Sequence, residues 1–215
     1  MPESIDKQLN DTRVRLVNAK TDAALQEKLA PRGYTPEKLD EGLALYKTAA
    51  DAQDTLQKEG GEQEAATDAF TEAHKTCREL YDPHVGYARV LFDGDREARK
   101  ALGFSGRRKR STAGWIRQAQ QFYANALADP DYVAKFAGIS IPQTELEDGQ
   151  ARAAAVAAAD ETQEREKGDA QRAKDKRDQA LDALDDFMDP FLGIARVALA
   201  DDPQLLEKLM IRAPS

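Results

Sequence analysis

The chain matches itself when it is shifted by 107 residues, and this internal repeat constrains the fold more than any other feature. Segment 81–90 lies over segment 188–197 without a gap, and both contain Asp-Pro, a glycine three residues later and the run Ala-Arg-Val. Identities at this offset also fall on helix-capping residues, where backbone geometry is decided. We therefore predict two tandem copies of one unit, repeat 1 at about 5–104 and repeat 2 at about 112–211, joined by a basic linker at 105–111.

The spacing of apolar residues is helical through most of both copies, and no strand-like alternation occurs. The first predicted helix covers about residues 4–29, with a counterpart at about 112–136. Gly33 and Gly138 follow these helices as predicted stops. The predicted fold class is all-α: one domain over residues 1–215, an up-and-down helical bundle in which the two copies are related by a pseudo-two-fold axis.

A second helical pattern opens at Thr35-Pro36 and at Pro142 and runs to about residues 81 and 188. Its continuity is open. Two observations favour a break: Gly60-Gly61 costs about 2 kcal/mol inside a helix, and the flanking sequence is polar in both copies. Two observations favour a continuous helix: neither copy shows an N-cap after the glycine, and the apolar residues before and after it stay in helical phase. We favour a hairpin that breaks at Gly61 and at Gly168.

Asp-Pro at 82–83 and at 189–190 has the form of an N-cap followed by proline in the first turn, so each predicts the start of a further short helix. One interpretation of this block is structural: Asp82 and Asp189 cap the helices, and the block's glycines allow close packing. Arg89 and Arg196 then pair with a carboxylate or a helix C-terminus. The alternative is that the two arginines form an anion site beside the helix N-termini that Asp82 and Asp189 cap.

Residues with catalytic or metal-binding chemistry are few. The two histidines, His74 and His84, lie over Leu181 and Phe191 in the repeat, and the single cysteine, Cys77, lies over a leucine. Positions that accept apolar residues are typical of packing, so we predict a structural role for all three. Motifs for di-iron, zinc, nucleotide and hydrolase sites are absent from the sequence. No catalytic residue, metal ligand or cofactor is predicted.

The linker contains four consecutive cations, Arg107, Arg108, Lys109 and Arg110, in a chain of net charge −8. They are candidates for contact with an acidic partner or with the bundle itself. The acidic balance and the lack of interleaved aromatic residues argue against nucleic-acid binding. No apolar run is long enough to cross a membrane, and one cysteine fits a reducing cytoplasm, the predicted location.

Two blocks give the chain a resemblance to a known group of proteins. They are Gly-Arg-Arg-Lys-Arg-Ser at 106–111 with Trp115, and Ala-Arg-Val-Ala-Leu at 195–199 with the segment 202–209. At these blocks the chain resembles a group of uncharacterised bacterial proteins that are duplicated and helical. The resemblance implies helices over nearly the whole chain, and it implies no activity or site.

These observations favour a non-enzymatic structural or protein-interaction bundle, with another protein or a second copy of the chain as partner. The alternative is a binding protein for a small anionic or apolar ligand in a cleft between the two copies. A pocket lined by Arg89 and Arg196 favours the alternative, and an exposed apolar surface favours an interaction module.

Overall fold

The computed structural model describes residues 4–106, 109 and 111–212, and these are helical with no strand among them. The chain divides into two compact units. Unit 1 comprises residues 1–60 and 169–215, and unit 2 comprises residues 61–168. Each unit therefore combines one part of predicted repeat 1 with one part of predicted repeat 2. The all-α prediction is confirmed.

The helices form two series whose first residues lie 107 positions apart. The first series is α1 (Ile5–Thr21), α2 (Ala23–Leu29), α3 (Pro36–Leu91) and α4 (Arg96–Ala101), with a 3-10 turn, η1 (Ala30–Arg32), after α2. The second series is α5 (Thr112–Ala128), α6 (Pro130–Ala137), α7 (Gln143–Ala198) and α8 (Pro203–Lys208). Helices α3 and α7 have 56 residues each.

The predicted hairpin at Gly61 and Gly168 is wrong, because α3 and α7 continue through these glycines. A break would leave backbone N–H and C=O groups without helical partners, and neither copy supplies an N-cap to satisfy them. Apolar residues also continue in helical phase beyond each glycine, as the buried Ala66 and Ala170 show. The cost of glycine is therefore smaller than the cost of ending the helix.

The predicted helix starts at Asp82-Pro83 and Asp189-Pro190 are also wrong, because both prolines lie inside the long helices. Asp82 accepts a hydrogen bond from Arg78 at 3.0 Å. A proline costs about 3 kcal/mol in a helix interior, but buried residues lie on both sides of each one and hold the helix in place. In α3 they are Cys77, Tyr81, His84 and Ala88; in α7 they are Leu184, Met188, Phe191 and Ala195.

The first predicted helix of each copy is divided in two. The backbone is extended at Asp22 and at Asp129, which end α1 and α5 and cap α2 and α6. The Asp22 carboxylate accepts hydrogen bonds from the N–H groups of Ala24 and Leu25 at 3.0 and 3.1 Å. Asp129 does the same for Asp131 at 2.9 Å. Local capping therefore outweighs a continuous helix at these positions.

The turns after α2 and α6 contain a residue with positive φ. Gly33 has φ +92°, which confirms it as a helix stop. In the second series the left-handed residue is Ser140 (φ +65°), whereas the predicted stop, Gly138, has right-handed helical geometry. Thr35 accepts a hydrogen bond from the Lys38 N–H at 3.4 Å and caps α3, as predicted.

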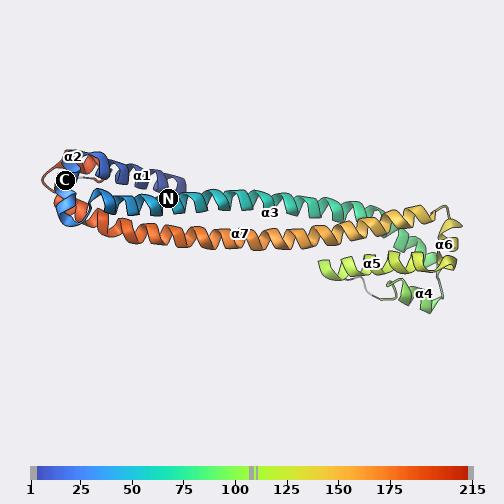
Figure 1. Cartoon of the computed structure of the whole chain (residues 1–215). Coiled ribbons are helices and arrows are strands. Elements are labelled where there is room, and N and C mark those ends of the chain that lie inside the picture. Colours follow the sequence, from blue (N-terminus) through green and yellow to red (C-terminus); the bar gives the residue numbers. More distant parts are fainter. Residues whose placement is uncertain (1–3, 107–108, 110, 213–215) are drawn as a thin grey trace. The chain divides into compact units, whose positions relative to one another are not determined.

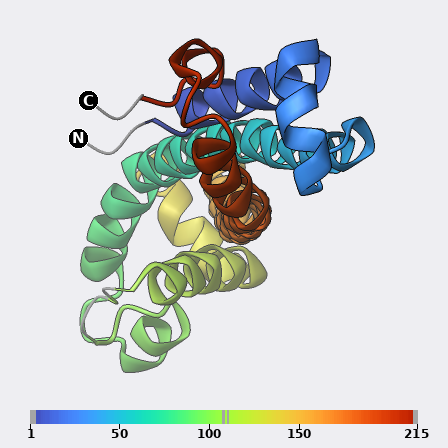
Figure 2. The ribbon, with the colours of Figure 1, turned by 90° about the vertical axis from the view of Figure 1, so that its left-hand side faces the viewer.

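Unit 1 contains α1, α2, the first part of α3, the last part of α7, and α8 (Figure 2). The short helix α8 lies against α1, because Arg15 and Asn18 donate hydrogen bonds to the carbonyls of Leu209 and Lys208 at 3.1 and 2.8 Å. Leucine and alanine dominate the core. Its large side chains include Leu16, Leu25, Leu29, Leu39, Leu184 and Phe191.

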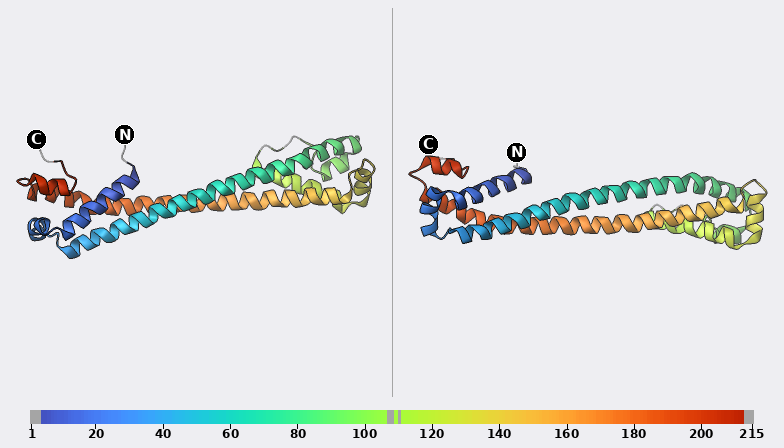
Figure 3. Two further views of the ribbon diagram at one scale, coloured as in Figure 1. Left: turned by 90° about the horizontal axis from the view of Figure 1, so that it is seen from above. Right: turned by 45° about the horizontal axis from the view of Figure 1, so that its top comes forward.

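Unit 2 contains α5, α6, the last part of α3, α4 and the first part of α7 (Figure 3). Arg152 donates to the Thr76 carbonyl and Gln163 donates to the Thr67 hydroxyl, so these parts of α7 and α3 run antiparallel. The core is rich in aromatic residues, which include Tyr81, Phe92, Trp115, Phe122, Tyr123 and Phe136.

Candidate functional site

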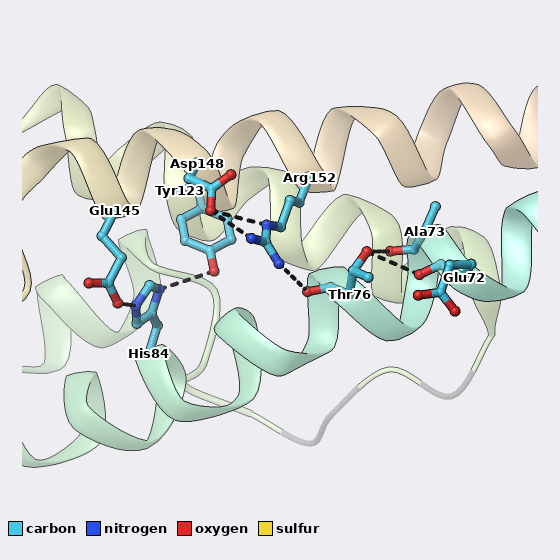
Figure 4. Close-up of polar contacts among 8 residues, drawn as sticks. All are labelled: Glu72, Ala73, Thr76, His84, Tyr123, Glu145, Asp148 and Arg152. Atoms are coloured by element: carbon cyan, nitrogen blue, oxygen red, sulfur yellow. Dashed lines mark hydrogen bonds and ion pairs between the residues drawn. The ribbon is translucent and has the colours of Figure 1, made fainter.

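A buried histidine links three helices of unit 2 (Figure 4). His84, on α3, is only 1% exposed. Its Nδ1 lies 3.1 Å from the hydroxyl of Tyr123 on α5, and its Nε2 lies 2.9 Å from the Glu145 carboxylate on α7. An ionised carboxylate can only accept, so Nε2 carries a proton toward Glu145. With Nε2 as the donor to Glu145, Nδ1 is placed to accept the hydrogen bond of the Tyr123 hydroxyl.

A second polar group lies one to two turns further along α7. Arg152 donates to the Asp148 carboxylate from Nε at 3.1 Å, and from its Nη1 to the Thr76 carbonyl at 3.1 Å. The neighbouring carboxylate raises the pKa of Arg152 above its ordinary value, because it stabilises the charged guanidinium. Arg152 thus ties α7 to α3 close to the histidine (Figure 4).

Gly149 creates the space in which the Tyr123 ring lies. A Cβ atom at residue 149 would come within 2.2 Å of the ring and 2.6 Å of its hydroxyl, so no other amino acid fits without displacing the tyrosine. The corresponding glycine of unit 1, Gly42, makes room for the ring of Phe187. The repeat aligns these two glycines, and each allows an aromatic ring to contact a long helix.

The surroundings keep the hydroxyl and the thiol of this core protonated. Burial raises the pKa of Tyr123 far above its usual range, and the nearby Cys77 and Tyr81 raise it further. Burial also raises the pKa of the Cys77 thiol to about 11. A nucleophilic cysteine needs a lowered pKa and access to solvent. Cys77 has neither, which agrees with the packing role predicted for it.

The order hydroxyl, imidazole, carboxylate is the order found in nucleophilic relays. Here the Tyr123 ring is fully buried and its hydroxyl lies against the backbone of Gly149, which leaves no room for a substrate at the oxygen. The network therefore fixes the positions of α3, α5 and α7. Within either unit taken alone, the described residues place no three His, Cys, Asp or Glu side chains close enough to share a metal ion.

The residues predicted for an anion site lie in different units. Arg89 is exposed in the last turn of α3 in unit 2, whereas Arg196 and Asp189 are exposed on α7 in unit 1. Arg89 lines a small hollow of about 100 Å³ together with Asp82, Tyr81, Gln118 and neighbouring residues.

The basic linker is described only in part. Arg107, Arg108 and Arg110, three of the predicted partner contacts, lie outside the described residues. The fourth, Lys109, donates its backbone N–H to the Gln118 side chain at 3.4 Å.

The buried network was missed because each position was compared singly. His84 over Phe191 indicated packing, and that interpretation is right for burial but omits the polar partners. Across the repeat, Tyr123, Glu145 and Arg152 lie over Leu16, Lys38 and Leu45. The signal in the sequence was that three polar residues of unit 2, His84, Tyr123 and Arg152, all lie over apolar residues of unit 1.

No protein-family model, curated protein or solved structure matches this chain. No helix of the described chain is long and apolar enough to cross a lipid bilayer.

Proposed function

We propose that the chain is a non-enzymatic protein-interaction bundle, in which an exposed apolar face on each long helix binds the partner. The observation that carries this proposal is an exposed row of residues at helical spacing on α3 and again on α7. We call each row an outer stripe. They are Pro83, Gly86, Tyr87 and Val90 on α3, and Pro190, Gly193, Ile194 and Val197 on α7.

The apolar members of the stripes are solvent-exposed to an unusual degree for such residues. Val90 is 76% exposed and Val197 is 79% exposed, while Tyr87 and Ile194 are 50% and 37% exposed. Positions 83, 87 and 90 are spaced i, i+4, i+7, so they share one face of the helix. Exposed apolar residues that share a face are typical of interaction surfaces.

The folding of the chain does not explain the residues of this block. Asp82 lies inside α3, where it pairs with Arg78 and does not begin a helix, and Pro83 lies in a helix interior where it weakens the helix. Among the described residues, a Cβ atom at Gly86 would meet nothing within 4 Å, so the glycine serves no close packing with them and alanine would favour the helix by about 1 kcal/mol. The same holds for Gly193. These residues weaken the helix and face solvent, and contact with a partner protein would explain why the chain has them.

The partner that fits this surface best is an amphipathic helix of another protein. Apolar residues at i, i+4 and i+7 match the apolar seam of a second helix, and a glycine in the row lets the two backbones approach. Arg89 and Arg196 adjoin Val90 and Val197, so acidic residues beside the partner's apolar face would complement them.

We also infer that the chain arose by internal duplication. The identical offset of the helix starts, the paired glycines Gly42 and Gly149, and the side chains of Asn18 and Asn125, which donate to the carbonyls of Lys208 and Ala101, support this inference. Duplication accounts for the presence of two outer stripes in one chain. The pseudo-two-fold axis and the cytoplasmic location predicted from the sequence stay part of this proposal.

The proposal is tested by affinity capture from native lysate, read by mass spectrometry. The variant Tyr87→Lys/Val90→Lys disrupts one outer stripe and Ile194→Lys/Val197→Lys disrupts the other. Glu72→Lys/Glu79→Lys is the matched control, because it places two lysines at exposed positions of the same helix α3. We expect proteins held by the wild type and the control to fall about tenfold or more with the stripe variants.

Equal capture by wild-type and stripe variants would contradict the proposal. The absence of any captured protein, combined with a small metabolite that raises the melting temperature, would instead favour the alternative of a small-ligand binding protein.

A further inference from the structure

Unit 2 carries a group of cations that neither the buried network nor the outer stripes use. We call the described members the basic surface: Arg96, Arg99, Lys100, Lys109 and Arg117. The sequence from 96 to 117 holds eight cations and one carboxylate, a charge of +7 within a chain of net charge −8. The rest of the chain therefore carries −15, and the positive charge is concentrated in one segment.

The described cations of the basic surface have no carboxylate partner, whereas most cations on the long helices of unit 2 have one, with Arg89 as the exception. On the long helices, cations pair with nearby carboxylates: Arg78 with Asp82, Arg152 with Asp148, Arg165 with Glu166 and Lys167 with Glu164. Within the part of the chain that the structure describes, the five side chains of the basic surface form no ion pair. Like charges left unpaired create a positive potential that a bound anion would relieve.

Three of these cations surround a hollow of a size suited to a small molecule. Arg96, Arg99 and Lys100 line an open space of about 610 Å³ together with Glu97 and Ser105. Small-molecule sites typically measure about 300–1,000 Å³. Side chains of α5 hold this segment in place: Gln118 donates to the Gly103 carbonyl and Asn125 donates to the Ala101 carbonyl, each at 2.6 Å.

The equivalent short helix of unit 1 forms without these cations. Over Arg96, Arg99 and Lys100 the repeat places Pro203, Leu206 and Glu207 in α8. Helix α8 and α4 nevertheless have the same length and the same aspartate N-cap. Folding of the segment therefore does not require the positive charge.

We propose that the basic surface binds a compact anion that bears several phosphate groups, at the hollow lined by Arg96, Arg99 and Lys100. Guanidinium groups donate in pairs to phosphate oxygens, and the Lys100 ammonium and the Ser105 hydroxyl add further donors. A long polyanion would extend beyond the basic surface onto an acidic chain, which repels it. None of the described residues that line the hollow is aromatic, whereas single-stranded nucleic acids bind on aromatic side chains. This inference does not depend on the outer stripes.

The test is isothermal titration of the full chain with tripolyphosphate, at low salt and at 0.15 M salt (roughly an 8 Å screening length). We expect binding at low salt that weakens at the higher salt. The variant Arg96→Gln/Arg99→Gln/Lys100→Gln should weaken it about tenfold or more. The matched control Lys75→Gln/Arg165→Gln/Lys167→Gln removes the same charge from paired cations of unit 2 and should stay within about twofold of the wild type.

A second variant, Lys100→Glu, changes one exposed residue and keeps the test valid if the triple variant fails to fold. The proposal is overturned if tripolyphosphate does not bind at low salt, or if the control variant weakens binding as much as the triple variant. Tighter binding of an oligoglutamate peptide, of duplex DNA or of vesicles with anionic lipids than of tripolyphosphate would also overturn it, because each would assign a different class of ligand.

Discussion

The two units place the same helices around different cores. In unit 1 the core positions are mostly leucine, with Phe191 contributed by α7 and Leu16 by α1. In unit 2 the positions that the repeat aligns with these two are His84 and Tyr123, which share a hydrogen bond. One arrangement of helices thus tolerates an apolar core and a core with a polar network.

The difference shows what each core contributes. Leucine packing has little directional preference, so many small displacements cost little. A hydrogen-bonded histidine fixes the distance and the angle of its partners and is costly if one of them is removed. We infer that unit 1 derives its stability from buried apolar area, while unit 2 also has a network that specifies how α3, α5 and α7 pack.

The strongest test exchanges the central residues of the two cores. Phe191→His places an imidazole in a core where Leu16 and Lys38 stand at the positions of its partners Tyr123 and Glu145, and we expect a loss of about 3–4 kcal/mol in the free energy of unfolding. His84→Phe leaves the Tyr123 hydroxyl without its acceptor, while the half-buried Glu145 can turn to water, so about 1–2 kcal/mol is expected. Urea unfolding followed by circular dichroism measures both.

An unchanged or higher stability of His84→Phe would show that the histidine network does not stabilise unit 2. Trp115 is the only tryptophan and lies in the core of unit 2, so its fluorescence reports on that unit by itself. His84→Phe should shift the unfolding transition that is followed by Trp115 fluorescence. Phe191→His should shift mainly the transition that is followed by circular dichroism.

The next test uses the paired glycines. Gly149→Ala would bring a Cβ atom within 2.2 Å of the fully buried Tyr123 ring, so a loss of about 2–3 kcal/mol is expected. Gly42→Ala meets Phe187, whose ring is only half-buried and can move outward, and alanine favours the helix by about 1 kcal/mol. We expect that variant to change stability little. Thermal unfolding measures both, and a larger loss for Gly42→Ala would contradict this explanation.

Four Asp-Pro dipeptides show how far the sequence could predict the fold. Those at 129–130 and 202–203 begin helices α6 and α8, whereas those at 82–83 and 189–190 lie inside α3 and α7. All four dipeptides have the same local sequence pattern, an N-cap residue followed by proline. They differ in whether buried residues continue on the same helical face before and after the proline, and that depends on tertiary packing. Composition and spacing were sufficient for the helical class and for the 107-residue offset of the helices.

The candidate sites were predictable to different extents. The Asp-Pro-Gly-Arg-Val block was visible as a repeated feature, but only the structure shows that its valines face solvent and that its glycines have open space around them. The buried network depends on contacts between residues 39 and 61 positions apart in the sequence. No pattern in the sequence encodes such distances.

A smaller effect is expected from pH. The pKa of the Cys77 thiol is raised to about 11 from an ordinary value of 9.0, so the folded chain keeps a proton that the unfolded chain loses. The free energy of unfolding therefore has its full value below about pH 9, and it falls by about 2 kcal/mol as the pH rises to about 11. Urea unfolding followed by Trp115 fluorescence at pH 8 to 11 should show this fall. Cys77→Ala should lessen it, and an unchanged fall would assign the effect to another group such as Tyr123.

The smallest effect concerns the turns. Ser140 in unit 2 and Met210 in unit 1 have φ of +65° and +55°, a backbone conformation that disfavours side chains, whereas the first series has Gly33 and Gly103 at the aligned positions. Ser140→Gly and Met210→Gly should therefore raise stability by about 0.5–1 kcal/mol each, since relief of strain exceeds the entropy that glycine adds to the unfolded chain. The reverse changes, Gly33→Ala and Gly103→Ala, should lower it by about 1 kcal/mol. The melting temperatures of the four variants show whether each change raises or lowers stability. A loss of stability in Ser140→Gly or Met210→Gly would show that the left-handed turns are not strained.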